Sequence, residues 1–244
     1  IIWLRAEGKA FERRTPLTPA DATALVGAGI KVFVERSAVR PYPDDDYAFA
    51  GCSLVDADSW ETAPPDAFVL GLKELPESIQ PLRHRHLYFA HAFKGQAGWQ
   101  ELLLRFRQGG GALYDLEYFV DGDGRRVAAF GHWAGFAGAA VASMAWCGRH
   151  SVERSDLAPL TAYPDKGALI ESCRRQLDGC KSTPKVMIIG SAGRCGAGAA
   201  ELFRELDLEV TLWDIEETRD GGPFEEILVH DVFVNCVFVS KPIP

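Results

Sequence analysis

Two polar residues follow apolar runs in the first half of the chain and carry groups that can exchange protons. Lys73 follows the run "FVLGL", and His91 lies among aromatic residues in "LYFAHAF". A lysine amine removed from water can act as a base, and a histidine titrates near neutral pH, so both suit acid–base catalysis. On the residues alone, a solvated lysine at the end of a strand and a buried structural histidine are the better explanations.

A glycine turn in the second half has the features of a dinucleotide site. The apolar run "KVMIIG" enters the turn, the segment "AGAAELFREL" leaves it as a helix, and "EVTLWD" ends in Asp214. Backbone amides at such a helix N-terminus bind a pyrophosphate, and the carboxylate accepts from a ribose hydroxyl. A carboxylate there would repel a 2′-phosphate, so we expect NAD and not NADP. The predicted cofactor-binding residues are Gly190, Gly193, Arg194, Cys195, Gly196, Asp214 and Cys236.

Two cysteines belong to this region. Cys195 lies in the turn, where a helix N-terminus favours thiolate, and Cys236 ends the apolar run "DVFVNC". If the two runs are neighbouring strands, the sulfurs approach each other, which gives the hypothesis of a redox-sensitive disulfide that obstructs NAD binding. The alternative to a disulfide is that the two cysteines are unrelated and serve only as small apolar residues. The six cysteines form no C-x-x-C pair, so we expect no metal site.

Composition limits the classes of partner. The chain has 244 residues, 47% of them apolar, and a formal net charge of −8 with no block of Lys or Arg. This excludes nucleic acid and an acidic membrane surface as main partners and favours a small-molecule substrate. No apolar run approaches the roughly 20 residues that span a bilayer. Scattered cysteines indicate a reducing compartment, and we expect a cytoplasmic protein.

Strands and helices alternate along the chain, as in parallel βαβ units. A helix at 18–29 has Thr18 as its expected N-cap and Pro19 at its first position. A second helix is expected at 97–111, and an apolar helix rich in small residues at 131–148. Strands are expected at 31–37, 67–75, 86–93 and 112–120, and in the second half at 184–190, 209–214 and 231–238, with a further helix at 168–179.

These elements predict an α/β protein with two Rossmann-like domains, mostly parallel sheets and an interdomain cleft. Residues 1–130 are the expected substrate and catalytic domain, 131–183 connecting helices, and 184–244 the NAD-binding domain. Only three strands of the second domain are expected, whereas a whole dinucleotide domain has about six, so we expect that domain to be incomplete.

Eight segments together resemble one enzyme family over nearly the whole chain. They are "LRAEGKAFERRTPLTP", "GLKELPE", "FAHAFKGQAGWQ", "LYDLEYF", "GRRVAAFGHWAGFAGAA", "IIGSAGRCGAGA", "WDIEETRDGGPFEEI" and "VNCVFVSKPIP". The chain is similar to the NAD-dependent, lysine-forming saccharopine dehydrogenases, which are relatives of alanine dehydrogenase and transhydrogenase. The resemblance implies oxidative cleavage of saccharopine to lysine and 2-oxoglutarate, or the reverse condensation.

The resemblance also implies roles for particular residues. Lys73 and His91 match the family's catalytic pair. The resemblance therefore favours catalytic roles for both, whereas the residues alone favour a solvated lysine and a structural histidine. Glu74 and Glu117 would lie near that pair, although either could equally form a surface salt bridge. Two arginines would bind substrate carboxylates, a task that suits the guanidinium fork. They are Arg14 and Arg126, with Arg13 and Arg125 as register alternatives.

Two other functions remain open at this point. An alanine-dehydrogenase-type enzyme would use ammonia and a small oxo acid, and the paired arginines weigh against it. A catalytically silent nucleotide-binding homologue would keep the fold without turnover, and Lys73, His91 and the glycine turn weigh against that. The direction of the reaction, the oligomeric state and a peroxisomal C-terminal signal are left open.

Overall fold

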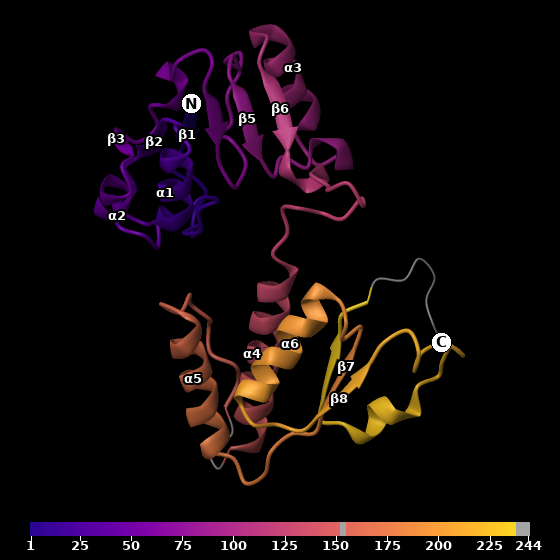
Figure 1. Cartoon of the computed structure of the whole chain (residues 1–244). Helices are drawn as coiled ribbons and strands as arrows, with labels where there is room; N and C mark the ends of the chain where they lie inside the picture. The colour runs from indigo at the N-terminus through magenta and orange to yellow at the C-terminus, as the bar shows by residue number, and fades with distance from the viewer. Residues whose placement is uncertain (152–154, 238–244) are drawn as a thin grey trace. The chain divides into compact units, whose positions relative to one another are not determined.

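The computed structural model describes residues 1–151 and 155–237, and the chain divides into two compact units, Ile1–Ala129 and Phe130–Pro244. The expected strand 231–238 lies partly outside the described residues, and the terminal "VSKPIP" lies wholly outside them. Both units combine helices with parallel strands (Figure 1). The expected α/β class with mostly parallel sheets is therefore confirmed.

The first unit is built on a six-stranded parallel sheet in the order β3-β2-β1-β4-β5-β6. Its strands are β1 (Ile2–Leu4), β2 (Val32–Glu35), β3 (Ser53–Val55), β4 (Phe68–Leu70), β5 (Arg85–Tyr88) and β6 (Ala112–Asp115). Its helices are α1 (Pro19–Gly27), α2 (Asp44–Phe49) and α3 (Trp99–Gly109), with short 3-10 helices η1 (Trp60–Thr62), η2 (Ala92–Lys94) and η3 (Leu116–Tyr118).

Helix α1 begins as its sequence predicts. The Thr18 side chain accepts a hydrogen bond from the Asp21 amide, and Pro19 occupies the first turn, where its missing N–H costs nothing. The apolar faces of the strands build the core beneath such helices. Leu4 and Val34, for example, are fully buried, and Tyr47 of α2 packs with them.

Three expected strands end earlier than predicted. The strand expected at 67–75 ends at Leu70, that at 86–93 ends at Tyr88, and that at 112–120 ends at Asp115. His91 cannot belong to a strand because its φ is 50°. After β6, the Asp115 carboxylate accepts from the Glu117 amide and starts a 3-10 turn. The apolar runs therefore continue into loops at the carboxyl edge of the sheet.

The second unit has a three-stranded parallel sheet in the order β8-β7-β9 within the described residues. The strands are β7 (Val186–Ile189), β8 (Val210–Trp213) and β9 (Val232–Asn235), and a 3-10 helix η4 (Glu225–Val229) precedes β9. The helices are α4 (Gly131–His150), α5 (Lys166–Asp178) and α6 (Arg194–Glu205), and α4 lies beside both α5 and α6 (Figure 1).

Small residues let α4 and α6 approach closely. A Cβ at Gly135 would lie 1.8 Å from the Cys195 carbonyl oxygen, and a Cβ at Gly198 would lie 1.9 Å from that of His132. Phe136 and Phe203 fill the core that the two helices share with the sheet. The small-residue pattern at 131–148 therefore marks a buried helix, as expected.

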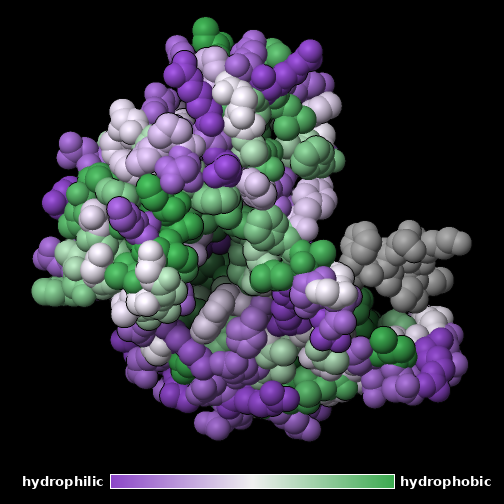
Figure 2. Space-filling model, turned by 45° about the horizontal axis from the view of Figure 1, so that its top comes forward, coloured by the Kyte–Doolittle hydropathy of each residue, from purple (hydrophilic) through white to green (hydrophobic). Residues whose placement is uncertain are grey.

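The surface mixes polar and apolar side chains. Figure 2 shows hydrophobic residues interspersed with hydrophilic ones over the face it presents. Among the described residues, no helix combines the length and the hydrophobicity that crossing a membrane requires.

Candidate functional site

Four chemically capable side chains follow the carboxyl ends of adjacent strands in the first unit. Arg5 follows β1, Lys73 lies in the loop after β4, His91 follows β5, and Glu117 lies in η3 after β6. Parallel strands end at the same edge of a sheet, and ligands of open α/β sheets bind outside that edge. This edge is therefore the candidate active site of the unit.

Glu117 gathers two cationic side chains and one imidazole. Its carboxylate lies 2.5 Å from Lys94 Nζ, 2.6 Å from Arg126 Nη2 and 3.9 Å from His91 Nδ1. Arg126 also donates to the Ala128 carbonyl at 3.2 Å. Of the two arginines in "GRR", the structure thus places Arg126 in the cluster, which brings together three of the predicted site residues.

The cations around Glu117 change its protonation. Burial acts to raise the pKa of the Glu117 carboxyl, but the hydrogen bond from Lys94 and the charges of Arg126, Lys94 and His91 outweigh it. The pKa therefore lies below the ordinary value, and the carboxylate stays charged. A charged carboxylate beside His91 can orient its imidazole and stabilise the imidazolium form.

His91 is held in a rare backbone conformation. It sits in the left-handed region at the start of η2, and its ring stacks at 6.2 Å from that of Phe89. Nδ1 is buried and has no hydrogen-bond partner within the described part of the chain. Strained residues concentrate at functional sites, and the His91 side chain as a whole is 25% exposed, so its ring can exchange a proton with a bound molecule.

Lys73 is half-buried three residues after β4, among acidic side chains. Burial acts to raise the pKa of Glu74, but its own backbone amide, the Lys9 side chain at 3.0 Å and the charge of Lys73 together lower it. The charge of Lys73 also contributes to lowering the pKa of Glu12. The structure thus places Lys9 and Glu12 near the consecutive residues Lys73 and Glu74.

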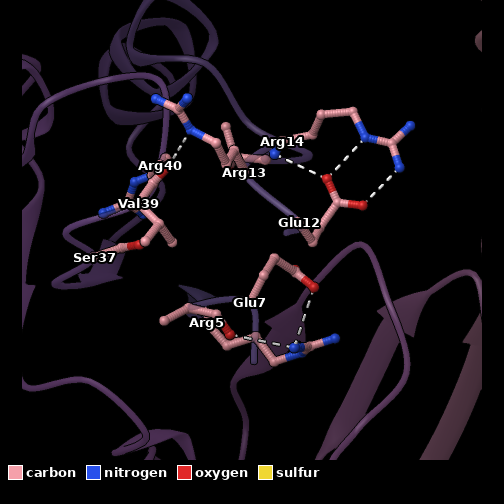
Figure 3. A pocket seen from close by; sticks show the side chains of 10 residues that line it. Arg5, Glu7, Glu12, Arg13, Arg14, Ser37, Val39 and Arg40 are labelled. Carbon is pink, nitrogen blue, oxygen red and sulfur yellow. Dashed lines mark hydrogen bonds and ion pairs between the residues drawn. The ribbon is translucent and has the colours of Figure 1, made fainter. Parts of the chain in front are cut away.

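Arg14 belongs to a small pocket next to this group (Figure 3). Its Nε and Nη2 donate to the two oxygens of Glu12 at 2.8 and 2.6 Å, and this bidentate pair is the main reason that the pKa of Glu12 is low. Arg13 lines the same pocket and donates to the Val39 carbonyl at 3.2 Å. With a volume of about 10 Å³, the pocket has room for about one water.

Five residues of this edge carry no signal in the sequence reading. They are Arg5, Glu7, Lys9, Glu12 and Lys94. The first four follow β1, and this three-residue strand is too short to be predicted from periodicity. Lys94 follows His91 by one 3-10 turn, a spacing that becomes visible only once η2 is known.

The predicted glycine turn connects β7 to α6 in the second unit. Gly190 has a φ of 86°, and Gly193 is the N-cap of α6, with no side chain capping the helix. A Cβ at Gly196 would lie 2.1 Å from the Gly190 carbonyl oxygen. The turn therefore needs glycine at Gly190 and Gly196, and a helix N-terminus offers backbone amides that an anion can accept from.

Asp214 follows β8 beside this turn. Its Oδ2 accepts from the Ala192 amide at 2.7 Å and its Oδ1 from the Ile215 amide at 3.0 Å. The carboxylate thus fixes the turn and lies where it can also accept from a ribose hydroxyl. The glycine cradle, the helix N-terminus and this carboxylate fit NAD, and Gly190, Gly193, Gly196 and Asp214 would hold it.

Cys195 and Cys236 are neighbours at this turn. Both are free thiols, and burial together with the hydrogen bond to Cys195 raises the pKa of Cys236 to about 12. The Cys236 amide donates to the Ile189 carbonyl at 2.8 Å, so the residue continues the pairing of β9 with β7. The expected proximity is present, and the disulfide itself stays a prediction. Arg194 opens α6 next to Cys195.

Within the described ranges, no group of three or more His, Cys, Asp or Glu side chains is arranged to hold a metal ion.

Comparisons with known proteins agree with this arrangement. The family model of the alanine dehydrogenase/PNT N-terminal domain matches residues 3–137. The chain is 44% identical over 251 residues to a saccharopine dehydrogenase [NAD(+), L-lysine-forming] of Yarrowia lipolytica, covering 100% of this chain and 68% of that protein. A protein of the same name from Emericella nidulans is 47% identical over 254 residues, with the same coverage.

More distant relatives share the fold. An α-aminoadipic semialdehyde synthase of Bos taurus is 27% identical over 93% of this chain and 26% of that protein. Among solved structures, an L-alanine dehydrogenase has a TM-score of 0.55 at 20% identity, covering 97% of this chain and 61% of its own. A transhydrogenase from Sinorhizobium meliloti has a TM-score of 0.59 at 18% identity, and the match covers 100% of this chain and 71% of the transhydrogenase chain. At these identities the two structures show the fold alone.

Proposed function

The chain belongs to the family of NAD-dependent, L-lysine-forming saccharopine dehydrogenases, and on that premise we propose that it interconverts saccharopine with lysine and 2-oxoglutarate. The carboxyl edge of the first sheet would bind the amino acid substrate, and the β7–α6 turn would bind NAD. The observation that carries the proposal is the gathering of Lys73, Glu74, His91 and Glu117 at one sheet edge in a chain so similar to this family.

Two arginines would bind substrate carboxylates. Saccharopine carries three carboxylates, and a guanidinium binds such a group with two parallel hydrogen bonds. Arg126 lies at the Glu117 cluster, and Arg14 lies beside Glu12 and lines the small pocket. Each arginine already binds a carboxylate of the protein, Glu12 or Glu117. A substrate carboxylate would therefore meet a guanidinium that is already held in position for such a bond.

Lys73 would remove the proton from the secondary amine of saccharopine. Neutral lysine is the form that accepts a proton, and after transfer the ammonium would be stabilised by Glu12 and Glu74. When bound, NAD supplies the acceptor for the hydride that leaves the carbon next to this amine.

His91 would then assist hydrolysis of the resulting imine. Its partly exposed ring can take a proton from water as the oxygen adds to the imine carbon, and Glu117, 3.9 Å from Nδ1, would stabilise the imidazolium. Collapse of the carbinolamine releases lysine and 2-oxoglutarate, with the proton returned to the departing amine. The overall change consumes one water and one NAD⁺ per saccharopine.

The test is NADH oxidation by the full-length protein with lysine plus 2-oxoglutarate, measured beside pyruvate plus ammonia and beside lysine with other oxo acids. Turnover only with lysine and 2-oxoglutarate supports the proposal. Turnover with pyruvate and ammonia would assign an alanine-dehydrogenase-type activity instead. NADH binding without any turnover would identify a silent homologue.

The same proposal assigns substrate binding and catalysis to residues 1–130, NAD binding to 184–244, and a connecting role to 131–183. All six cysteines are free thiols, which supports a reducing compartment such as the cytoplasm, with the peroxisome as the alternative. Fractionation of cells that express the tagged full-length protein distinguishes the two compartments.

A further inference from the structure

We propose that Arg5 and Glu7 act as positioning residues that hold the Lys73 backbone from both sides, an inference that rests on the proposed function of Lys73. Neither side chain contacts the Lys73 amine in the described contacts. Both instead bind the peptide groups at Lys73. We call this pair the Lys73 clamp.

Glu7 binds the amide side of the loop. Its Oε1 accepts from the Leu72 amide at 2.7 Å, and its Oε2 accepts from the Lys73 amide at 2.9 Å. Two hydrogen bonds from consecutive amides to one carboxylate fix the direction of the backbone that leaves β4. Bonds to a charged acceptor are about twice as strong as neutral ones.

Arg5 binds the carbonyl side of the same residue. Its Nη2 donates to the Lys73 carbonyl oxygen, and its Nη1 lies 3.5 Å from Glu7 Oε2 (Figure 3). The two side chains are only 2% and 6% exposed, so solvent screens the pair little. The clamp is therefore a buried ion pair in which each partner also holds Lys73.

The surroundings fix the guanidinium in turn. A Cβ at Gly71 would lie 2.2 Å from Arg5 Nε, so only glycine leaves room for this side chain beneath the loop. On another side, the guanidinium carbon lies 5.8 Å from the centre of the Tyr88 ring. Because Tyr88 belongs to β5 and Arg5 follows β1, the loop after β4 is tied to both neighbouring strands.

A bound backbone matters because Lys73 lies beyond the end of its strand. The ladder between β4 and β5 ends at Leu70, and beyond it the Gly71 amide still donates to the Leu87 carbonyl at 2.9 Å. Without the clamp, the Lys73 peptide groups would have water as their partner, and the amine would lose its fixed place beside Glu12 and Glu74. A shift of about 1 Å in a reacting group can cost about 100-fold in rate.

Glu35 offers a matched control. It is fully buried and accepts from Trp3 Nε1 at 3.0 Å, from the Ala6 amide at 2.8 Å and from the Asp58 amide at 3.1 Å. It is therefore a second buried carboxylate that holds backbone amides in the same sheet. One of its bonds holds the Ala6 amide, between the two clamp residues, but none reaches the Lys73 loop. Its loss therefore reports the structural cost of such a group, including any general loosening of the segment that carries Arg5 and Glu7, without removing a contact to Lys73.

The experiment compares Glu7→Gln, Arg5→Lys and Glu35→Gln in the full-length protein. Glu7→Gln keeps the shape but turns one acceptor oxygen into a donor that faces an amide. Three quantities are measured: kcat for lysine plus 2-oxoglutarate, the Kd of NADH, and the pH dependence of Lys73 acetylation by acetic anhydride, read by mass spectrometry. The labelling needs no turnover, so it tests the clamp even if the wild-type protein proves inactive and the proposed function fails.

If the clamp positions Lys73, Glu7→Gln lowers kcat by about 10- to 100-fold and shifts the labelling curve of Lys73, while the Kd of NADH changes by less than about twofold. Arg5→Lys gives a smaller change in the same direction and serves in its place if Glu7→Gln fails to fold. Glu35→Gln lowers Tm but leaves the labelling curve in place. A labelling curve unchanged in both clamp variants, or shifted equally by Glu35→Gln, would overturn the inference.

Discussion

The carboxyl edge of the first sheet and the β7–α6 turn of the second unit occupy equivalent places in two parallel sheets, yet they are built differently. The turn places backbone amides through glycines that are close in the chain, at Gly190, Gly193 and Gly196. The edge places side-chain charges from loops after β1, β4, β5 and β6. Backbone geometry is encoded locally, whereas a constellation of side chains depends on strand order.

This difference predicts different sensitivities. At the turn, one added methyl group should weaken binding because it meets backbone atoms and the turn must open. At the edge, loss of one functional group should remove a chemical step and leave the fold intact. The predictions below test that contrast, from the largest expected effect to the smallest.

Lys73→Met should cause the largest loss. Removal of the proposed base lowers kcat by about 10²- to 10⁴-fold, while NADH binds as before because its proposed site belongs to the other unit. The measurement is steady-state NADH oxidation with lysine and 2-oxoglutarate, beside NADH binding by fluorescence. Lys31→Met removes an exposed lysine that precedes β2 and serves as the control. If Lys73→Met keeps more than a tenth of the wild-type kcat, another group is the base.

Gly196→Ala should weaken NADH binding. The added Cβ would lie 2.1 Å from the Gly190 carbonyl oxygen, so the turn must open. Overpacking of this kind costs about 1–3 kcal/mol, equivalent to about 5- to 150-fold in Kd. Titration with NADH measures the change.

Gly138→Ala is the control for this substitution. A Cβ at Gly138, inside α4, meets no atom within 4 Å, and Ala is favoured over Gly in a helix by about 1 kcal/mol. It should raise Tm slightly without changing the Kd of NADH. Equal NADH affinity in Gly196→Ala and wild type would contradict the glycine-cradle interpretation.

Asp214→Asn should change the choice of cofactor. The amide loses the negative charge that would repel a 2′-phosphate, and it weakens the bond from Ala192 at 2.7 Å. Hydrogen bonds to charged groups contribute about 1.5–3 kcal/mol, so NADH binding falls by about tenfold or more and the preference over NADPH narrows. Parallel titrations with NADH and NADPH measure both effects. An unchanged ratio of the two affinities would remove Asp214 from the ribose site.

Glu117→Gln should give the smallest of the predicted effects. It should lower the free energy of unfolding, by an amount that depends on pH. Burial acts against the charge, but Lys94, Arg126 and His91 hold the pKa of Glu117 below its ordinary value of 4.5. Its contribution to stability is therefore fully present above that value and is lost as the pH falls through the lower pKa of the folded state. We expect wild type to exceed the variant by up to about 1 kcal/mol at neutral pH and the difference to shrink in acid.

Thermal unfolding of both proteins between neutral and acidic pH measures this trend. Glu101→Gln, which removes an exposed carboxylate from α3, controls for the loss of one negative charge. A difference between wild type and Glu117→Gln that stays constant over the whole pH range would show that the cluster does not hold Glu117 in its charged form.

The sequence predicted the second unit's turn well because its signals are local. Helix α6 begins at Arg194, directly after Gly193 and three residues before the expected segment, so that Gly196 lies in its first turn, and β8 ends one residue before Asp214. The cap of α1 was predicted for the same reason, since Thr18 and Asp21 are three residues apart. Each of these features depends on neighbours in the chain, and backbone propensity alone is enough to specify them.

The first unit was predicted less completely. Strands β1 and β3 have three residues each, too few for periodicity to reveal, and the runs after β4, β5 and β6 are apolar but not extended. The sequence therefore placed Lys73 on a strand that ends at Leu70. It also missed Glu12. The contact of Glu12 with Arg14 joins residues two positions apart, but its nearness to Lys73 follows from the pairing of β1 with β4.

The sequence by itself determined the alternation of strands and helices, the glycine turn with its acidic partner, and which residues could carry the chemistry. Only the tertiary structure decided that Glu117 binds Arg126 and Lys94 beside His91, and that Arg5 and Glu7 enclose the Lys73 peptide groups. The reason is that these contacts join residues 9 to 68 positions apart in the chain. Strand order and register set such distances, and no local pattern encodes them.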